Sequence, residues 1–313
     1  MRKHVKLRII LLLTGMTLFA LGVTGLSQGK GAVEVKGRKT GPHELYSPIR
    51  LAFCADGNLL VSDYRVGAIM TVDPKDRQVI RSFAVQGKPL GVAYARGRIF
   101  VGNDSKACIE VYNKAGVKLK NFVFSQPVQT PTDIAVDEKQ GYIFVVDAGQ
   151  KKVKVFNLKG KFIRSFPGLD PENEILTNPT GITVDPAAGE VFVSDYGDRT
   201  KYIYPRIQIF DYNGNLLDTI KGKQGMFGVR FSRPQGLAVD DSGHVFMVDC
   251  YSGEIMAFDR YTGQTLKTMA GYGTDPGQLR LPLDIVIDPS SKDIYVTNNR
   301  SAAIEIFKNG GVL

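Results

Sequence analysis

The segment from Pro234 to Gly271 reads PQGLAVDDSGHVFMVDCYSGEIMAFDRYTGQTLKTMAG, and its pattern recurs along the chain. It contains four short apolar runs rich in β-branched and aromatic side chains, which is typical of β-strands. Turns that contain glycine separate these runs. The runs predict strands at residues 237–239, 244–248, 254–258 and 265–269. The segment therefore predicts one four-stranded unit of a β-sheet protein.

A proline opens each copy of this unit. It occurs as Pro48, Pro89, Pro131, Pro179, Pro234 and Pro282. The spacing of about 41 to 55 residues is too long for leucine-rich or ankyrin repeats and fits the blades of a propeller. The sequence predicts an all-β fold, a six-bladed β-propeller with four-stranded antiparallel blades.

A second landmark is an Asp or Asn at the end of the second strand of each unit. It occurs as Asp63, Asn103, Asp147, Asp195, Asp249 and Asn298. A short acceptor side chain at this point can bond nearby backbone N–H groups and hold the following turn. Because all six units keep this chemistry, we interpret the column as structural and count none of its members as catalytic.

Three segments of these units resemble the NHL repeat family. They are residues 178–185 (NPTGITVD), 191–195 (VFVSD) and 271–282 (GYGTDPGQLRLP). The resemblance spans about residues 32 to 313 and implies the propeller fold. It does not imply one function, because the family includes enzymes, sensor domains and binding platforms.

The last unit supplies three strands, at residues 285–287, 293–297 and 304–307, before the sequence stops at Leu313. Residues 32–36 (AVEVK) precede the first unit and alternate like a strand. We expect this N-terminal segment to add the fourth strand of the sixth blade and close the ring, which removes an open sheet edge. Residues 28–313 are then one propeller domain.

The N-terminus has a different composition. Four basic residues precede an apolar run from Ile9 to about Leu26, and small residues occur near its end at Gly25 and Ser27. This order is typical of a secretory signal peptide, although the length of the run approaches that of a membrane anchor. We expect residues 1–27 to direct export to the periplasm or the outside of the cell, either as a cleaved signal or as a tether through residues 9–26.

Charge and cysteine content restrict the partners. The chain has 40 basic and 31 acidic residues, and four of the basic ones lie in the signal, so the exported part has 36 basic residues and a net charge of +5. This mild excess is typical of a solvated surface and, outside the cell, does not favour nucleic acid. Cys54, Cys108 and Cys250 form no CxxC motif, and we expect them to be free thiols.

Two sets of loops should share one face of the ring: the loops from second to third strand, and the loops that enter each blade. Tyr and Arg dominate this face, and such side chains combine apolar area with directional donors. The candidate ligand-binding residues are Tyr64, Arg65, Lys106, Lys151, Tyr196, Arg199, Tyr202, Tyr204, Tyr251 and Arg300 on the loops, with Arg50, Asp133 and Asp284 near the central channel. The loop from Tyr196 to Arg206 is the longest of its set and the best single candidate.

Two functions compete. We favour an exported, monomeric, non-catalytic scaffold that binds a protein or peptide, or else an anionic polymer, without a cofactor or metal. The alternative is a metal-dependent channel enzyme of lyase or lactonase type, because the resemblance includes the amidating lyase with its His-ligated zinc. Only His43 and His244 follow the signal, and three-His zinc sites need one more. We also expect Asp133 and Asp284 to start on opposite sides of the ring, too far apart to converge on calcium.

Overall fold

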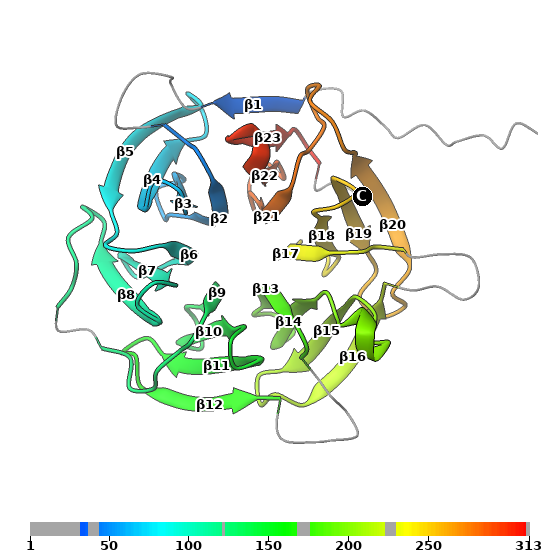
Figure 1. The fold of residues 1–313 in the computed structure, drawn as a ribbon, viewed down its shortest axis with the longest axis horizontal. Coiled ribbons are helices and arrows are strands. Elements are labelled where there is room, and N and C mark those ends of the chain that lie inside the picture. The colour runs from blue at the N-terminus through cyan, green and yellow to red at the C-terminus, as the bar shows by residue number, and fades with distance from the viewer. Residues whose placement is uncertain (1–31, 37–43, 121–122, 168–175, 223–229, 311–313) are drawn as a thin grey trace, which may run out of the picture.

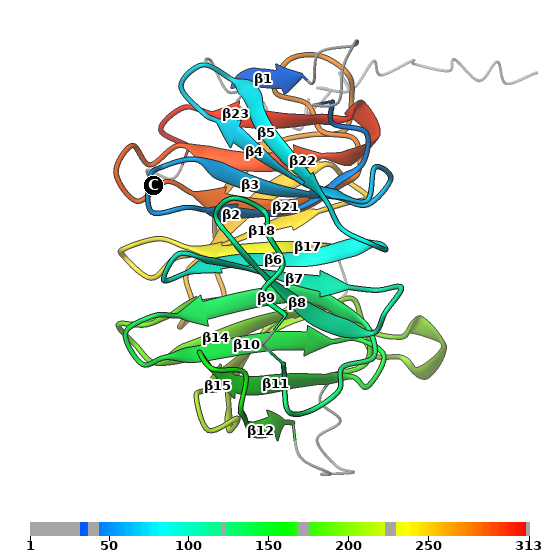
Figure 2. The same ribbon diagram turned by 90° about the vertical axis from the view of Figure 1, so that its left-hand side faces the viewer.

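The computed structural model describes residues 32–36, 44–120, 123–167, 176–222 and 230–310. In this part of the chain, six antiparallel sheets surround a central axis like the blades of a propeller (Figure 1). The side view shows that the strands run across the thickness of the disc, so their loops gather on its two faces (Figure 2). The predicted six-bladed β-propeller is confirmed.

The blades follow one another in chain order, and each begins with its innermost strand. Blade 1 contains β2 (Pro48–Phe53), β3 (Leu59–Asp63), β4 (Ala68–Asp73) and β5 (Gln78–Ala84). Blade 2 contains β6 (Pro89–Ala95), β7 (Arg98–Asn103) and β8 (Cys108–Asn113). Blade 3 contains β9 (Pro131–Asp137), β10 (Tyr142–Asp147), β11 (Lys152–Asn157) and β12 (Phe162–Phe166).

The second half of the ring repeats this order. Blade 4 contains β13 (Pro179–Asp185), β14 (Glu190–Asp195), β15 (Arg206–Asp211) and β16 (Leu216–Lys221). Blade 5 contains β17 (Pro234–Val239), β18 (Val245–Asp249), β19 (Glu254–Phe258) and β20 (Thr265–Ala270). Blade 6 contains β21 (Pro282–Ile287), β22 (Ile294–Asn298) and β23 (Ala303–Phe307), and its outermost strand is β1 (Ala32–Lys36).

The N-terminal strand closes the ring as expected. β1 pairs antiparallel with β23 from Ala32 opposite Phe307 to Lys36 opposite Ala303, and it lies outside β23 in Figure 1. In blade 2, an isolated bridge between Tyr112 and Lys118 stands where the other blades have an outermost strand. Among the described residues, no helix is long and apolar enough to cross a membrane. The predicted signal, residues 1–27, lies outside the described residues.

The core is divided among the boundaries between blades. One apolar cluster lies at each of the six boundaries, including the boundary between blades 6 and 1. Phe144, Phe192 and Phe246 on the second strands are fully buried in these clusters. A blade with two apolar faces is stable only when both neighbours cover it, so closure of the ring stabilises every blade.

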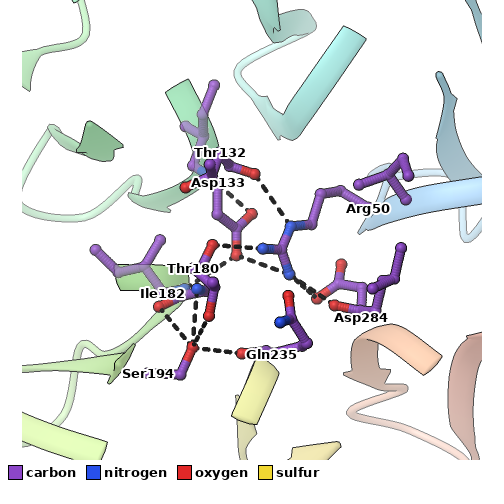
Figure 3. A network of polar contacts seen from close by, with 12 residues as sticks. Arg50, Thr132, Asp133, Thr180, Ile182, Ser194, Gln235 and Asp284 are labelled. Atoms are coloured by element: carbon purple, nitrogen blue, oxygen red, sulfur yellow. Dashed lines mark hydrogen bonds and ion pairs between the residues drawn. The ribbon is translucent and has the colours of Figure 1, made fainter. Parts of the chain in front are cut away.

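The prolines help to shape the channel. A proline at the first position of a strand costs no ladder hydrogen bond. Just after it the register shifts, as between Pro48 and Leu51 in blade 1. Such a bulge releases the intervening residues from the ladder and changes the direction of their side chains. Arg50, two positions after Pro48, reaches the channel in this way (Figure 3).

Candidate functional site

The Asp and Asn column joins the two loop sets of the candidate face. Asp63 Oδ2 accepts hydrogen bonds from the N–H groups of Tyr46 and Ser47, at 2.6 and 2.9 Å, on the loop that enters blade 1. Its Oδ1 accepts from Arg65 and Val66, at 3.1 and 3.0 Å, on the loop from second to third strand. One buried carboxylate therefore holds both loops on the same face, which confirms the predicted turn role and the predicted pairing of the loops.

Blades 4 and 5 repeat this arrangement. Asp195 accepts from Thr177 and Asn178 on the entering loop, both at 2.8 Å, and from Gly197 on the other loop at 2.9 Å. Asp249 likewise accepts from Arg233 at 3.1 Å and from Tyr251 at 2.9 Å. Side chains on these loops are thus carried by backbone that the fold holds in place.

The candidate residues on the loops are mostly exposed. Those exposed are Arg65, Lys106, Lys151, Arg199, Tyr202, Tyr204, Tyr251 and Arg300, whereas Tyr64 and Tyr196 are half-buried. Tyr202 is 82% exposed and ends a short 3₁₀ helix, η1 (Arg199–Lys201), which Asp198 caps through Thr200 N–H. Arg300 lies in a similar turn, η2 (Asn299–Ser301), on blade 6.

The structure brings only some of these candidates together. Tyr64 contacts Lys88, whose Nζ lies 5.1 Å from the ring centroid, and Lys106 forms a 3.1 Å ion pair with Glu110 on its own blade. These contacts lie on blades 1 and 2. On blades 4 and 5, by contrast, two candidates converge on one residue.

That residue is Arg233, which is absent from the candidates predicted from the sequence. Its guanidinium carbon lies 4.3 Å from the ring centroid of Tyr196 and 5.3 Å from that of Tyr251. Its Nη1 also donates to the Tyr251 hydroxyl at 3.0 Å. The sequence did offer a signal for this residue, because Arg233 directly precedes the repeat proline Pro234. Among the six repeats, only one other has a basic residue before its proline, namely Lys88.

This cluster is part of the lining of a cavity of about 490 Å³ on the candidate face. The lining comes from blades 3 to 6: Thr132, Ala148, Asn178, Pro179, Thr180, Tyr196, Arg233, Gln235, Cys250, Tyr251, Leu281 and Leu283. Its wall is partly apolar, with Pro179, Leu281 and Leu283, and partly polar. Such a mixture is typical of pockets that bind a small group or a side chain.

Arg50 binds the backbone of three residues that line this cavity. It donates from Nε to Thr132 O at 3.1 Å, from Nη1 to Leu283 O at 2.8 Å and from Nη2 to Thr180 O. Its Nη1 lies 3.6 Å from Asp133 Oδ2 and 3.3 Å from Asp284 Oδ1 (Figure 3). One buried guanidinium therefore joins blade 1 to blades 3, 4 and 6 across the channel. A second cavity of about 300 Å³, lined by Asp133 and Asp284, lies on the other side of this layer.

These contacts correct the expectation about the two carboxylates. Asp133 and Asp284 do start on strands of opposite blades, but both side chains reach the same guanidinium because the channel is narrow. All three candidates near the channel, Arg50 included, are buried and bound to one another. They close the channel midway and are not part of the exposed loop surface.

Glycines make room for this layer. Two positions after the proline, the six blades carry Arg50, Gly91, Asp133, Gly181, Gly236 and Asp284. A Cβ on Gly236 would lie 2.2 Å from Asp284 Oδ1, and a Cβ on Gly181 would lie 2.3 Å from Gln235 O. The axis thus holds one Arg and two Asp because three of the blades contribute no side chain.

The layer has an unusual balance of charge, since two carboxylates share one guanidinium. Burial raises the pKa of Asp284 to about 7, with Arg50 opposing this rise and the neighbouring Asp133 adding to it. Burial also raises the pKa of Asp133 against the effect of Arg50. In a buried site one guanidinium does not fully compensate two negative charges.

The remaining titratable candidates are dispersed. His244 Nδ1 lies 2.8 Å from Asp240 Oδ2 in the turn between β17 and β18, on the face opposite the loops. His43 lies outside the described residues. Within the described ranges, no three His, Cys, Asp or Glu side chains gather in a way that could hold a metal ion.

The three cysteines are free thiols, as expected. Burial raises the pKa of Cys54 to about 11 and that of Cys250, in the wall of the cavity, to about 12. Reactive cysteines have a lowered pKa, so these thiols are inert by comparison.

Fold and site together define a six-bladed β-propeller with a closed channel and a recessed, aromatic loop face. No protein-family model and no curated protein sequence matches the chain. Solved structures do match its fold. A Kuenenia stuttgartiensis hydrazine synthase chain aligns with 88% of this chain and 99% of its own length, at 13% identity and a TM-score of 0.62.

Two further structures show the same architecture. A chain of a nidogen/laminin complex aligns over 80% of this chain and 93% of its own, at 18% identity and a TM-score of 0.57. A structural genomics protein of unknown function from Bacteroides thetaiotaomicron VPI-5482 aligns over 88% and 75%, at 16% identity and a TM-score of 0.65. At such low identity these likenesses establish the propeller fold alone.

Proposed function

We propose that this protein is an exported, non-catalytic propeller that binds a protein or peptide partner through its loop face. The observation that carries the proposal is the Tyr196–Arg233–Tyr251 cluster, which lines the 490 Å³ cavity. Tyrosine and arginine are the side chains that most often carry the binding energy of protein interfaces. Here they are held together beside a recess that can accept a partner's side chain.

The loops around this cluster support the same role. Tyr251 is 59% exposed and Tyr202 is 82% exposed, so both present large amphipathic side chains to solvent. Buried Asp195 and Asp249 hold the backbone of their loops. A partner that binds here loses little conformational freedom in the propeller, and preorganisation of this kind favours affinity.

The channel geometry favours binding over catalysis. A lyase or lactonase of the alternative type needs ligands that converge on an open channel, whereas the middle of this channel is filled by Arg50 and its two carboxylates. Metal analysis of the purified full chain tests this point, because stoichiometric zinc or calcium would shift the assignment to an enzyme.

Membership of the NHL repeat class and export belong to the same proposal. They rest on the repeat segments at residues 178–185, 191–195 and 271–282, and on the basic and apolar residues 1–27. The N-terminal sequence of the protein recovered from its own cells tests export: a start near Gln28 indicates cleavage, and an intact N-terminus in the membrane fraction indicates a tether. A full-length chain in the cytosol would contradict export.

A capture experiment tests the binding face. The full chain, a Tyr202→Ala/Tyr251→Ala variant and a Lys159→Ala/Lys161→Ala control on the opposite face are each incubated with cell envelope from the source. A partner identified with the wild type is then purified and titrated against all three. Loss of two interface anchors should weaken binding at least tenfold, since each can contribute about 2 kcal/mol, without changing the melting temperature.

Two outcomes would count against this face. The Tyr variant could bind the purified partner as tightly as the wild type does. Alternatively, the lysine control could bind as weakly as the Tyr variant and binding could fall steeply with salt, which would indicate a diffuse attraction to an anionic polymer instead.

A further inference from the structure

Arg233 lines the cavity, and its backbone is held on both sides. Its backbone N–H donates to Asp249 Oδ2 at 3.1 Å, and its carbonyl accepts from Cys250 N–H at 3.1 Å. The next residue is Pro234, which fixes the start of β17. The guanidinium then lies between the Tyr196 and Tyr251 rings. Backbone and side chain are thus both restrained before any ligand arrives.

The charge of this guanidinium is not balanced within the described part of the chain. Arg206 pairs with Asp195 at 3.0 Å, and Arg260 pairs with Glu190 at 2.5 Å. Arg233 has no carboxylate partner among the described residues; its side chain donates to the neutral Tyr251 hydroxyl at 3.0 Å. A guanidinium stacked on aromatic rings can still donate from its remaining edge N–H groups, and such an edge matches a carboxylate with two parallel hydrogen bonds.

The lining of the cavity indicates which chemical groups the rest of the ligand should carry. Pro179, Leu281 and Leu283 give it an apolar wall. The carbonyls of Thr132, Thr180 and Leu283, which also line it, are already bound to Arg50. A group with its charge beside Arg233 and its apolar part against Pro179, Leu281 and Leu283 therefore fits this lining.

We propose that Arg233 binds a carboxylate of the partner, with the apolar group next to that carboxylate seated against Pro179, Leu281 and Leu283. This inference rests on the proposed binding function and names the chemistry that the face recognises. The carboxylate has two sources in a peptide, the free C-terminus and an Asp or Glu side chain. The Tyr196 and Tyr251 rings act as positioning residues for the guanidinium.

Four fluorescein-labelled peptides distinguish these sources by fluorescence anisotropy with the full chain. The first pair is Gly-Ser-Gly-Ala-Leu with a free C-terminal carboxylate and the same peptide with a C-terminal amide. The second pair is Gly-Leu-Glu-Leu-Gly with a C-terminal amide and its Gln counterpart. In at least one of the two pairs, we expect the peptide with the carboxylate to bind at least about tenfold more tightly than its neutral counterpart.

Two variants and a control connect the effect to Arg233. Arg233→Gln should abolish the preference for carboxylate, and Arg233→Lys should keep only part of it because lysine cannot form two parallel hydrogen bonds. Arg65→Gln removes the same charge from blade 1 of the same face and should leave the preference unchanged. Melting temperatures of all proteins are measured in parallel, and Arg233→Lys serves as the deciding variant if Arg233→Gln does not fold.

The inference is overturned if carboxylate and neutral peptides bind the wild type equally, if none of the four binds at millimolar concentration, or if the Arg233 variants keep the full preference. These failures would leave the face proposal standing when the captured partner still depends on Tyr202 and Tyr251. Failure of both experiments together would remove the binding function itself.

Discussion

A single side chain, Asp195, shows how the repeat column acts at the scale of one residue. It is fully buried, and it accepts backbone hydrogen bonds from Thr177, Asn178 and Gly197 as well as an ion pair from Arg206. Its carboxylate accepts hydrogen bonds from backbone N–H groups of two loops, which lie outside the strand ladders. The chemistry of the residue type and its place after an apolar run were enough to predict this role.

We expect Asp195→Ala to lower the free energy of unfolding by about 1 to 3 kcal/mol, because it leaves buried donors without a partner. Asp195→Asn is the matched control and should lose less, since Asn already serves in this column as Asn103 and Asn298. Urea unfolding measures the difference. An alanine variant of full stability that no longer binds the partner would show that the column has a binding role.

Gly236 offers a second test at this scale. A Cβ there would lie 2.2 Å from Asp284 Oδ1 and 2.5 Å from Asp284 Cα, which is backbone and cannot move aside. Gly236→Ala should therefore destabilise the protein by about 1 to 3 kcal/mol, the usual cost of overpacking.

Gly189→Ala is the control for Gly236→Ala. Its new Cβ would meet nothing within 4 Å, so it carries only the strain of a φ of +69°. Thermal unfolding of both variants should show the larger loss at Gly236. Full stability of Gly236→Ala would mean that the glycines of the axis are not needed for close approach.

At the scale of elements, β1 is the part whose role was clearest from the sequence. The last repeat supplies only three strands, and an alternating apolar segment precedes the first repeat. The structure pairs this segment with β23 over five residues. Blade 2 shows the limit of the same reasoning, because the repeat pattern continues there while, among the described residues, the outermost position holds the isolated Tyr112–Lys118 bridge and no strand.

Removal of residues 32–36 should lower stability by several kcal/mol, because it takes away a complete ladder and opens one edge of blade 6. The comparison is between chains that begin at residue 32 and at residue 37. Melting temperature and resistance to protease report the effect, and identical values for both chains would refute closure by β1.

At the scale of the whole molecule, Arg50 couples blades 1, 3, 4 and 6 through one guanidinium and two carboxylates. The stability of the entire ring should therefore respond to their titration. The pKa of Asp284 is about 7 in the folded protein against an ordinary value of 3.8. A raised pKa means that the folded protein holds this proton more tightly than the unfolded chain does.

The contribution of Asp284 to stability is therefore complete below about pH 4 and is lost as the pH rises through 7. Each tenfold difference in proton affinity between the folded and unfolded chains corresponds to about 1.4 kcal/mol. Asp284→Asn imitates the neutral acid, so wild type should lose stability relative to this variant between about pH 4.5 and about pH 8.

Urea unfolding across that range measures this difference, with Asp56→Asn on an exposed turn as the control. The Asp56→Asn variant makes the same Asp-to-Asn change but leaves the layer of Arg50, Asp133 and Asp284 intact. A constant gap between wild type and Asp284→Asn would mean that Asp284 does not change its charge in this window.

The sequence by itself determined the propeller, its six blades, the closing strand and the face on which the loops gather. These features depend on periodic patterns of apolar residues, prolines and turn acceptors, which are local and repeat along the chain. Ten of the candidate site residues were placed on that face for the same reason, since the position of a loop follows from the order of its strands.

Only the tertiary structure decided which of these residues act together. Asp133 and Asp284 are 151 positions apart in the sequence, and their shared contact with Arg50 depends on the width of the channel, which three glycines set. Arg233 likewise became a candidate binding residue only because its guanidinium contacts two tyrosine rings, Tyr196 on blade 4 and Tyr251 on blade 5. Distances across a ring result from the packing of all six blades at once, and no local pattern in the chain encodes them.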